Sequence, residues 1–162
     1  MSVLSRFYED IEIGEEIEFG SRVFKTDSIK DFAGKYDPQP FHMDEDAAKT
    51  SHFGSLCASG WQTASTWMRF YVDHNMAIRK ASEAAGAAIP KISVSPGMEN
   101  LKWMRPVYVG DEITFWQTIA AKRPLASRPG WGLVTSECGG HNQKGEPVIS
   151  FVSKNFVQMR DS

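Results

Sequence analysis

The stretch GWQTASTWMRFYV, residues 60–72, decides how this chain of 162 residues folds, because it predicts a long buried helix. Arg69 is its one charged residue, and a helix that is apolar almost all round is usually buried. The helical pattern continues as far as Ala85, and Gly86 is suited to end it. One face of the helix carries Trp61, Ala64, Ser65, Met68, Tyr71 and Val72, whereas Trp67 and Phe70 lie elsewhere on it.

Four strands are expected after this helix, because the apolar pattern changes there from a helical to an alternating period. The pairs Gly110-Asp111 and Gly145-Glu146 mark turns between them. The expected strands cover residues 93–103, 112–122, 131–139 and 148–158.

A strand and a short helix are expected at the start of the chain. Residues 17–25 indicate a strand that follows a turn at Gly14. The run Thr26-Asp27-Ser28 then supplies N-cap chemistry for a short helix. One face of that helix carries Ile29, Phe32 and Ala33.

Two prolines shape the segment between the short helix and the long one. Pro38 and Pro40 disfavour helical backbone at the residues before them, so the first helix must stop near Tyr36. Residues 37–40 are therefore expected to be extended and stiff. Residues 44–50 are expected to form another short helix, with acidic residues at its positive N-terminal end.

This order of elements predicts an α+β fold. An antiparallel sheet wrapped around one long central helix accounts for both the strand and the helix patterns. The chain shows no internal repeat, low-complexity tract or linker, so residues 1–162 are expected to form a single domain.

Composition narrows the classes of function. The formal net charge of −2 argues against a nucleic-acid partner, which rewards a concentrated basic face. Cys57 and Cys138 are far apart and belong to no CxxC pair, which is typical of a cytoplasmic protein with free thiols. No stretch resembles a signal peptide or approaches the ~20 apolar residues of a membrane span, so no membrane partner is expected.

Three segments resemble the MaoC-like dehydratase family, which includes the (R)-specific enoyl-CoA hydratases. The run FAGKYDPQPFH, residues 32–42, followed by Asp44 and Ala47-Ala48, is similar to the family motif Gly-Asp-x-Asn-Pro-x-His. The run FGSLCASGW, residues 53–61, resembles the family's approach to its central helix. The run LKWMRPVYVGD, residues 101–111, resembles its strand-and-turn signature. The resemblance implies a single hotdog fold.

The resemblance also implies an enzyme, a lyase of fatty-acid metabolism that reversibly hydrates a 2-enoyl thioester. Asp37 and His42 would hold the water, since a carboxylate and an imidazole can take up and return its protons. The Gly60 N–H, at the start of a helix, would stabilise the charge that develops on the thioester oxygen. The carrier would be CoA or an acyl-carrier protein, with no metal and no redox cofactor. The family also implies a homodimer or a higher homo-oligomer.

Three further residues are candidates for binding the substrate. Ser59 is suited to cap the long helix and could also contact the thioester or the water. Gln39 could orient His42 or the water, although a surface turn position is slightly favoured. Trp61 could line an acyl pocket or belong to the core. Gly60 could likewise serve close packing rather than charge stabilisation.

Two rival functions remain open on the sequence. A hotdog acyl-CoA thioesterase would use an acidic residue on the central helix, and residues 60–72 contain none. A non-catalytic thioester-binding subunit is favoured by three departures from the hydratases, namely Tyr36 for Gly, Gln39 for Asn and Ser59 for His.

Two other arrangements of the same residues are disfavoured. A nucleophile-base pair of Cys57 and His52 is disfavoured by the apolar setting of Cys57. A metal site built from His42, Asp44 and His52 lacks the spacing of zinc motifs.

Overall fold

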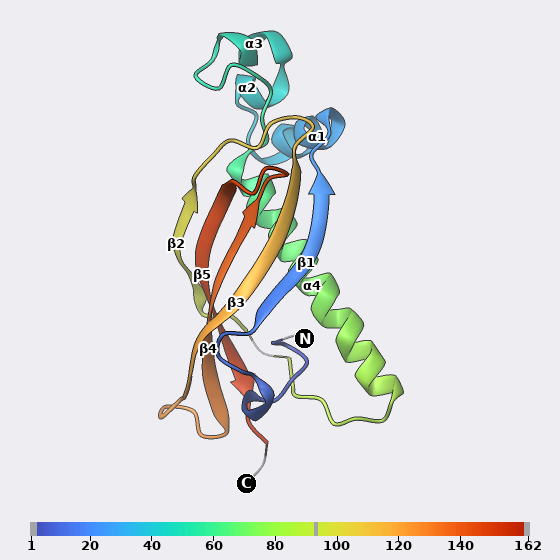
Figure 1. The fold of residues 1–162 in the computed structure, drawn as a ribbon, viewed down its shortest axis with the longest axis vertical. Helices are drawn as coiled ribbons and strands as arrows, with labels where there is room; N and C mark the ends of the chain where they lie inside the picture. The colour runs from blue at the N-terminus through green and yellow to red at the C-terminus, as the bar shows by residue number, and fades with distance from the viewer. Residues whose placement is uncertain (1–2, 93, 161–162) are drawn as a thin grey trace.

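The computed structural model describes residues 3–92 and 94–160, and in it one antiparallel sheet lies against one long helix (Figure 1). The strands are β1 (Glu16–Val23), β2 (Gly97–Trp103), β3 (Glu112–Pro124), β4 (Trp131–His141) and β5 (Pro147–Gln158). They are arranged in the order β1-β3-β4-β5-β2, and every neighbouring pair is antiparallel. The long helix α4 (Gly60–Ala84) runs along one face of this sheet.

The strands confirm the change of period that the sequence indicates. β3, β4 and β5 extend the expected ranges by one to two residues at their ends, and β1 lies within two residues of its expected bounds. β2 is shorter than expected because it begins at Gly97, and residue 93 lies outside the described residues. The predicted turns are present, with positive φ at Gly14, Gly110 and Gly145.

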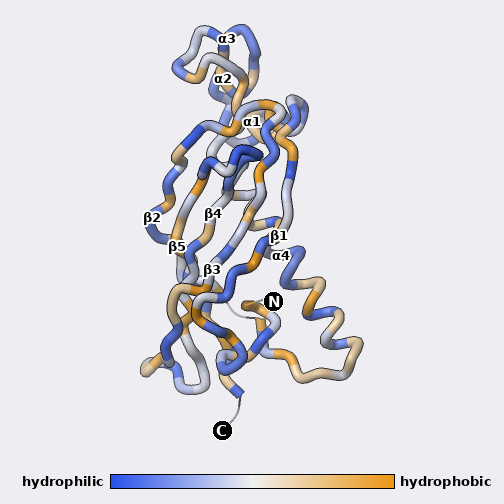
Figure 2. Tube along the Cα trace, viewed as in Figure 1, coloured by the Kyte–Doolittle hydropathy of each residue, from blue (hydrophilic) through white to orange (hydrophobic). Residues whose placement is uncertain are grey.

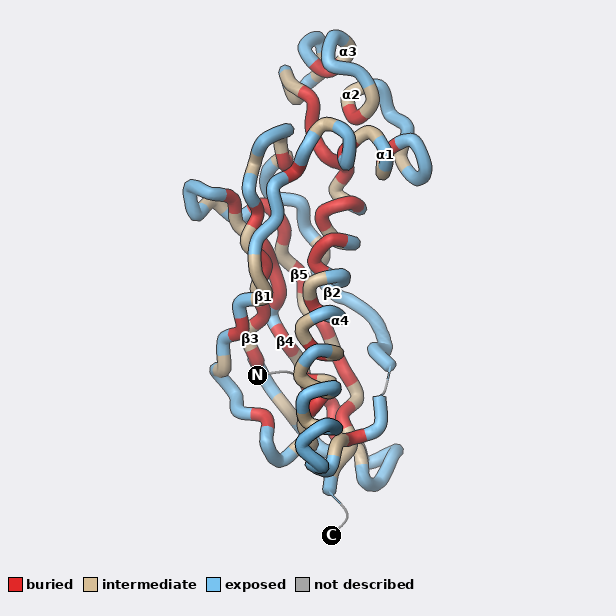
Figure 3. Tube along the Cα trace, turned by 90° about the vertical axis from the view of Figure 1, so that its right-hand side faces the viewer, coloured by how far each residue is buried: buried red, intermediate tan, exposed pale blue. Residues whose placement is uncertain are grey.

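The length of α4 was predicted correctly, but the helix is less completely buried than expected. The helix continues to Ala84 and is followed by Gly86 with φ +70°, as expected. Its buried residues are Gln62, Thr63, Thr66, Trp67, Tyr71 and Asn75. Trp61, Met68 and Val72 of the predicted apolar face are instead 56%, 39% and 39% exposed. Figure 3 shows the buried side of α4 turned toward the sheet.

Large aromatic side chains set the orientation of α4. Trp67 stacks on Tyr71 with ring centroids 5.0 Å apart and meets the edges of Phe19 and Phe151. Its indole N–H also donates to the Trp116 carbonyl at 3.0 Å. Trp67 and Tyr71 thus fill the space above the sheet, while Met68 and Val72 remain outside. Figure 2 shows hydrophobic segments alternating with hydrophilic ones along the outer part of α4.

Three short helices gather at one end of the sheet (Figure 1). They are α1 (Thr26–Tyr36), α2 (Pro40–Met43) and α3 (Glu45–Thr50), and a 3-10 helix, η1 (Tyr8–Asp10), lies near the N-terminus. Asp44 caps α3 by accepting from the Ala47 N–H at 2.8 Å, as its position predicts.

Two local predictions in this region need correction. The expected cap of α1 is wrong, because Thr26 already belongs to the helix and Lys25 precedes it without a side-chain cap. Ser28 donates back to the Lys25 carbonyl instead. The extended segment also ends earlier than expected. Pro40 opens α2 at a first-turn position that needs no N–H, while Gln39 stays extended.

No helix of the described residues is long and apolar enough to cross a membrane.

Candidate active site

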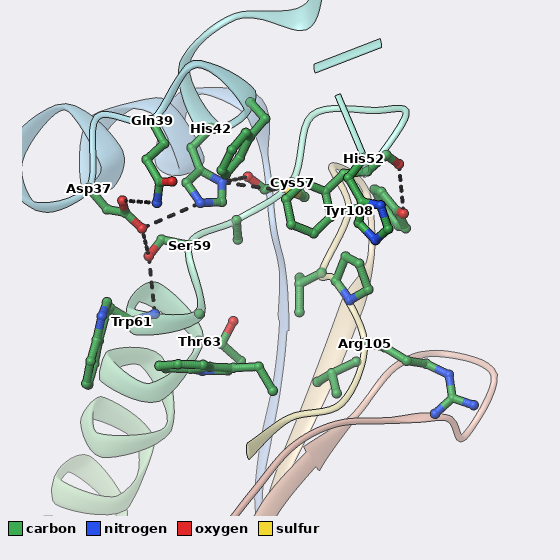
Figure 4. Close-up of a pocket in the computed structure, with 18 of the residues that line it drawn as sticks. Asp37, Gln39, His42, His52, Cys57, Ser59, Trp61, Thr63, Arg105 and Tyr108 are labelled. Atoms are coloured by element: carbon green, nitrogen blue, oxygen red, sulfur yellow. Dashed lines mark hydrogen bonds and ion pairs between the residues drawn. The ribbon is translucent and has the colours of Figure 1, made fainter. Parts of the chain in front are cut away.

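A cleft of about 550 Å³ opens where the first turn of α4 meets the loop between α1 and α2. Asp37, His42, Ser59 and Gly60 all line it (Figure 4). The end of β2 at Trp103 and residues 104–108, which follow it, also line the cleft. The fold therefore brings together two segments that the sequence separates by about sixty residues.

Asp37 points into this cleft because the chain leaves α1 there. Asp37 is the C-cap of α1, and its backbone N–H donates to the Ala33 carbonyl at 2.8 Å. Its φ of −154° is no longer helical, so the chain turns away from the helix axis at this residue. The carboxylate accepts hydrogen bonds of 2.7 Å from Gln39 Nε2 and from Ser59 Oγ. Partial burial acts to raise the pKa of Asp37, but these bonds and the nearby His42 outweigh it and hold the pKa below its ordinary value. Asp37 is thus kept as a carboxylate.

His42 faces Asp37 from α2 and is 5% exposed. Its Nδ1 lies 2.7 Å from the Cys57 carbonyl oxygen, which can only accept, so Nδ1 carries a proton. In neutral His42 the other nitrogen, Nε2, therefore has a free lone pair. Nε2 lies 3.5 Å from Asp37 Oδ2, and both atoms are then acceptors. A water about 2.8 Å from each could donate one of its two hydrogens to Asp37 and the other to His42.

Ser59 combines two hydrogen bonds in one fully buried hydroxyl. It accepts from the Trp61 N–H at 3.2 Å, which caps α4, and it donates to Asp37. The expected capping role is confirmed, and the second bond connects the helix start to the carboxylate. Ser59 thus contacts the site through Asp37.

Gly60 begins α4 with its N–H free of any acceptor among the described residues. A Cβ at this position would lie 2.5 Å from the indole ring of Trp103. The absence of a side chain at Gly60 therefore allows Trp103 to pack closely. It also leaves the Gly60 N–H accessible as a hydrogen-bond donor at the positive end of the helix. The two interpretations of Gly60 are compatible.

Gln39 and Trp61 occupy the rim of the cleft. Gln39 is exposed, as a turn residue would be, but its amide binds Asp37 rather than His42. Trp61 is not a core residue. It meets Trp103 edge to face at 5.1 Å and lines the cleft with its other surface.

Several cleft residues were not singled out by the sequence. Thr63, Trp103 and Tyr108 all line the cavity. Helical spacing from Gly60 could have drawn attention to Thr63, which lies one turn further on. Trp103 and Tyr108 carry no local signal, because only the sheet topology brings the end of β2 beside α4.

The disfavoured arrangements find no geometric support in the described residues. Cys57 is 1% exposed and burial raises the pKa of its thiol to about 11, so it is a poor nucleophile. His52 is exposed and packs against the Phe53 ring. No group of three or more metal-ligating side chains occurs in residues 3–92 and 94–160.

The architecture and the position of the cleft define a hotdog protein. A solved MaoC-like dehydratase from Rhodospirillum rubrum is 35% identical, covers 97% of this chain and 99% of its own, and superposes with a TM-score of 0.80. The R-hydratase PhaJ1 from Pseudomonas aeruginosa shares the fold at 20% identity, with coverage of 96% and 88% and a TM-score of 0.69.

The family can be stated more closely. Residues 10–129 match the model of the MaoC-like domain. An uncharacterized protein, YdeM of Bacillus subtilis (strain 168), is 27% identical over 87% of this chain and 91% of its own. The chain belongs to the MaoC-like dehydratase family, a family that includes hydratases and dehydratases.

Proposed function

We propose that this protein is a hydro-lyase that reversibly adds water to a 2-enoyl thioester to give the 3-hydroxyacyl thioester. The observation that carries the proposal is the pair of facing acceptors, Asp37 Oδ2 and His42 Nε2, which lie 3.5 Å apart at the wall of the cleft. One water molecule can bind to this pair by donating one proton to each acceptor.

The bound water would react as its oxygen bonds to the β-carbon. One of the two groups accepts a proton from the water in that step. The same proton is then passed to the α-carbon, so that hydroxyl and hydrogen enter on one face. Asp37 and His42 return to their starting protonation states, and no metal or redox cofactor is needed.

The Gly60 N–H would stabilise the enolate oxygen of the thioester. It is an unpaired donor at the positive end of a helix of 25 residues. Trp61 would form part of the wall along which the thioester carrier, CoA or an acyl-carrier protein, enters. Gln39 and Ser59 would act on the reaction through Asp37, whose charge and direction they fix.

The proposal is tested with crotonyl-CoA and longer 2-enoyl-CoAs by following the loss of enoyl absorbance. Asp37→Asn and His42→Ala are each expected to lower kcat by roughly 10²–10⁴-fold, the usual contribution of a positioned proton-transfer group. His52→Ala is the control, because His52 lines the same cleft but is exposed and contacts neither group.

Three results would contradict this function. Near-full rates in both site variants would show that the pair does not carry the reaction. Release of free thiol without hydration would identify a thioesterase. Binding of acyl-CoA without any loss of enoyl absorbance over a broad panel would identify a non-catalytic thioester-binding subunit.

We further propose that the protein is a homodimer. β2 is an edge strand that pairs only with β5 within the described chain, and unpaired edges favour association. Met68 and Val72 of α4 and Met98 of β2 are also exposed apolar residues. A two-fold axis near this edge would cover both features.

Sedimentation equilibrium tests the dimer. The wild type is expected to sediment at twice the protomer mass, and the double variant Met68→Glu with Val72→Glu at the protomer mass. Lys49→Glu, on exposed α3, is the control and should remain dimeric. A monomeric wild type at all concentrations would exclude the proposal.

A further inference from the structure

Three hydroxyl-bearing residues of the described chain line the cleft, and two of them have partners. Ser59 donates to Asp37, and Tyr108 donates to the Phe53 carbonyl at 2.9 Å. The third, Thr63, is 2% exposed and makes no side-chain hydrogen bond within the described residues. In Figure 4 its hydroxyl oxygen points toward the end of α4 that carries Ser59.

The neighbouring hydroxyls of α4 show that this arrangement is not forced by the helix. Ser65 donates to the Trp61 carbonyl at 2.7 Å, and Thr66 donates to the Gln62 carbonyl at 2.8 Å. These are the usual bonds of a helical hydroxyl to the preceding turn. The carbonyl that Thr63 would use is that of Ser59, which already accepts from the N–H groups of Gln62 and Thr63. The Thr63 hydroxyl remains directed at the cleft.

An alkyl chain in this cleft would leave the Thr63 hydroxyl buried without a partner. Apolar side chains make up much of the cleft lining, and they include Phe41, Ala58, Trp103, Val107 and Val148. A polar group that loses water and gains no hydrogen bond disfavours the complex. A ligand that brings its own hydrogen-bonding oxygen to this position avoids that loss. Sites built around such a bond discriminate strongly against analogues that lack the oxygen.

We propose that Thr63 selects acyl thioesters whose acyl group carries a neutral oxygen substituent, a hydroxyl or a keto group, beyond the reacting double bond. This rests on the proposed function, because it takes the cleft to be the acyl site. A carboxylate is disfavoured as the substituent, since it would lie in the same cleft as the ionised Asp37, and Arg105, the cation of that lining, already pairs with Glu146. Thr63 is thus a specificity residue and takes no part in proton transfer.

Binding of saturated acyl-CoAs tests the inference without relying on turnover. Calorimetry would compare butyryl-CoA with 4-hydroxybutyryl-CoA, and valeryl-CoA with 5-hydroxyvaleryl-CoA. The wild type is expected to bind at least one hydroxylated member roughly fivefold or more tightly than its partner, as one satisfied buried hydrogen bond implies. Thr63→Val, which keeps the shape and removes the hydroxyl, should bring that ratio to about one.

Two variants make the result specific. Thr63→Ser retains a hydroxyl and should retain the preference. Thr66→Val removes a hydroxyl that is already bonded within the helix and lies outside the cleft, so the preference should remain. A ratio of one in the wild type for both pairs would overturn the inference.

The failure of this inference can be told apart from failure of the proposed function. A preference that disappears in Thr63→Val supports the inference even if no enoyl thioester is hydrated. Conversely, if hydration occurs and Thr63→Val lowers kcat equally for substituted and unsubstituted enoyl-CoAs, the hydroxyl acts on the reacting atoms, and the selectivity role is wrong.

Discussion

The two faces of α4 depart from the usual distribution of polarity, because polar residues are buried on one face and apolar residues are exposed on the other. The face toward the sheet buries Gln62, Thr66 and Asn75, whereas the face toward solvent exposes Met68 and Val72. A surface helix ordinarily shows the opposite arrangement. The difference teaches that the orientation of this helix is decided by the size and hydrogen bonding of its side chains more than by their hydropathy.

The buried amide groups of Gln62 and Asn75 bond to backbone, although Gln62 Oε1 has no partner within the described residues. Gln62 Nε2 donates to the Ser28 carbonyl at 2.9 Å, and this hydrogen bond connects α4 to α1. Asn75 donates to the Tyr71 carbonyl and accepts from the Leu4 N–H. Such bonds offset the cost of removing amides from water. The buried polar residues therefore connect α4 to the segments around it.

The largest expected effect comes from comparing one tryptophan on each face. Trp67→Ala should lower the free energy of unfolding by about 3–5 kcal/mol, because it removes a fully buried aromatic core residue. Trp61→Ala should lower it by only about 1 kcal/mol, the worth of its edge contact with Trp103. Urea unfolding measures both. Equal losses would show that the two faces contribute alike.

A smaller effect is expected where α4 begins. Gly60→Ala should lower the free energy of unfolding by about 1–3 kcal/mol, because the new methyl group meets the Trp103 ring. Gly34→Ala is the control, since its methyl group would lie at an ordinary 3.6 Å from Met43 and should stabilise α1 by about 0.5–1 kcal/mol. Trp103→Leu should relieve the loss in Gly60→Ala. A Gly60→Ala protein as stable as wild type would remove the packing argument.

The smallest effect on stability concerns Ser59. Ser59→Ala should cost about 0.5–2 kcal/mol through the lost helix cap. It should also raise the pKa of Asp37, because one of the hydrogen bonds that lower it disappears. Since the folded-state pKa is depressed, Asp37 stabilises the fold above its unfolded pKa, and this contribution is lost as pH falls through the folded pKa. The contribution should be smaller in Ser59→Ala.

The pH dependence of the hydration rate is expected to report the same change in the pKa of Asp37. Its decline at acidic pH should begin at a higher pH in Ser59→Ala than in the wild type. Gln39→Ala should move the decline in the same direction without affecting the helix cap, because Gln39 also donates to Asp37. An unchanged acid limb in both variants would show that the carboxylate does not govern the rate.

Local patterns in the sequence predicted most of the elements but not their orientation. The strands, the stop of α1 before Pro38 and the length of α4 follow from periodicity and backbone stereochemistry. The buried face of α4 could not be predicted, because it depends on Trp67 meeting Phe19 and Phe151 from distant strands. Hydropathy alone favoured the stripe that includes Met68.

The candidate site was predicted in part for the same reason. Asp37 and His42 came from the family motif and Gly60 from the predicted start of the central helix, and all three line the cleft. That Gln39 binds Asp37 rather than His42 follows from the turn geometry, which no motif specifies. Thr63 and Trp103 were missed because their place depends on how β2 ends beside α4.

The Ser59 hydroxyl couples the protonation state of Asp37 to the stability of the first turn of α4. Protonating or replacing the Asp37 carboxylate weakens the acceptor to which Ser59 donates, and frees that hydroxyl to turn away from the Trp61 N–H. The first turn of α4 would then open more often. Amide hydrogen exchange at Trp61 would therefore speed up as Asp37 takes up a proton, so that a single backbone signal reports the charge of the site without any substrate present.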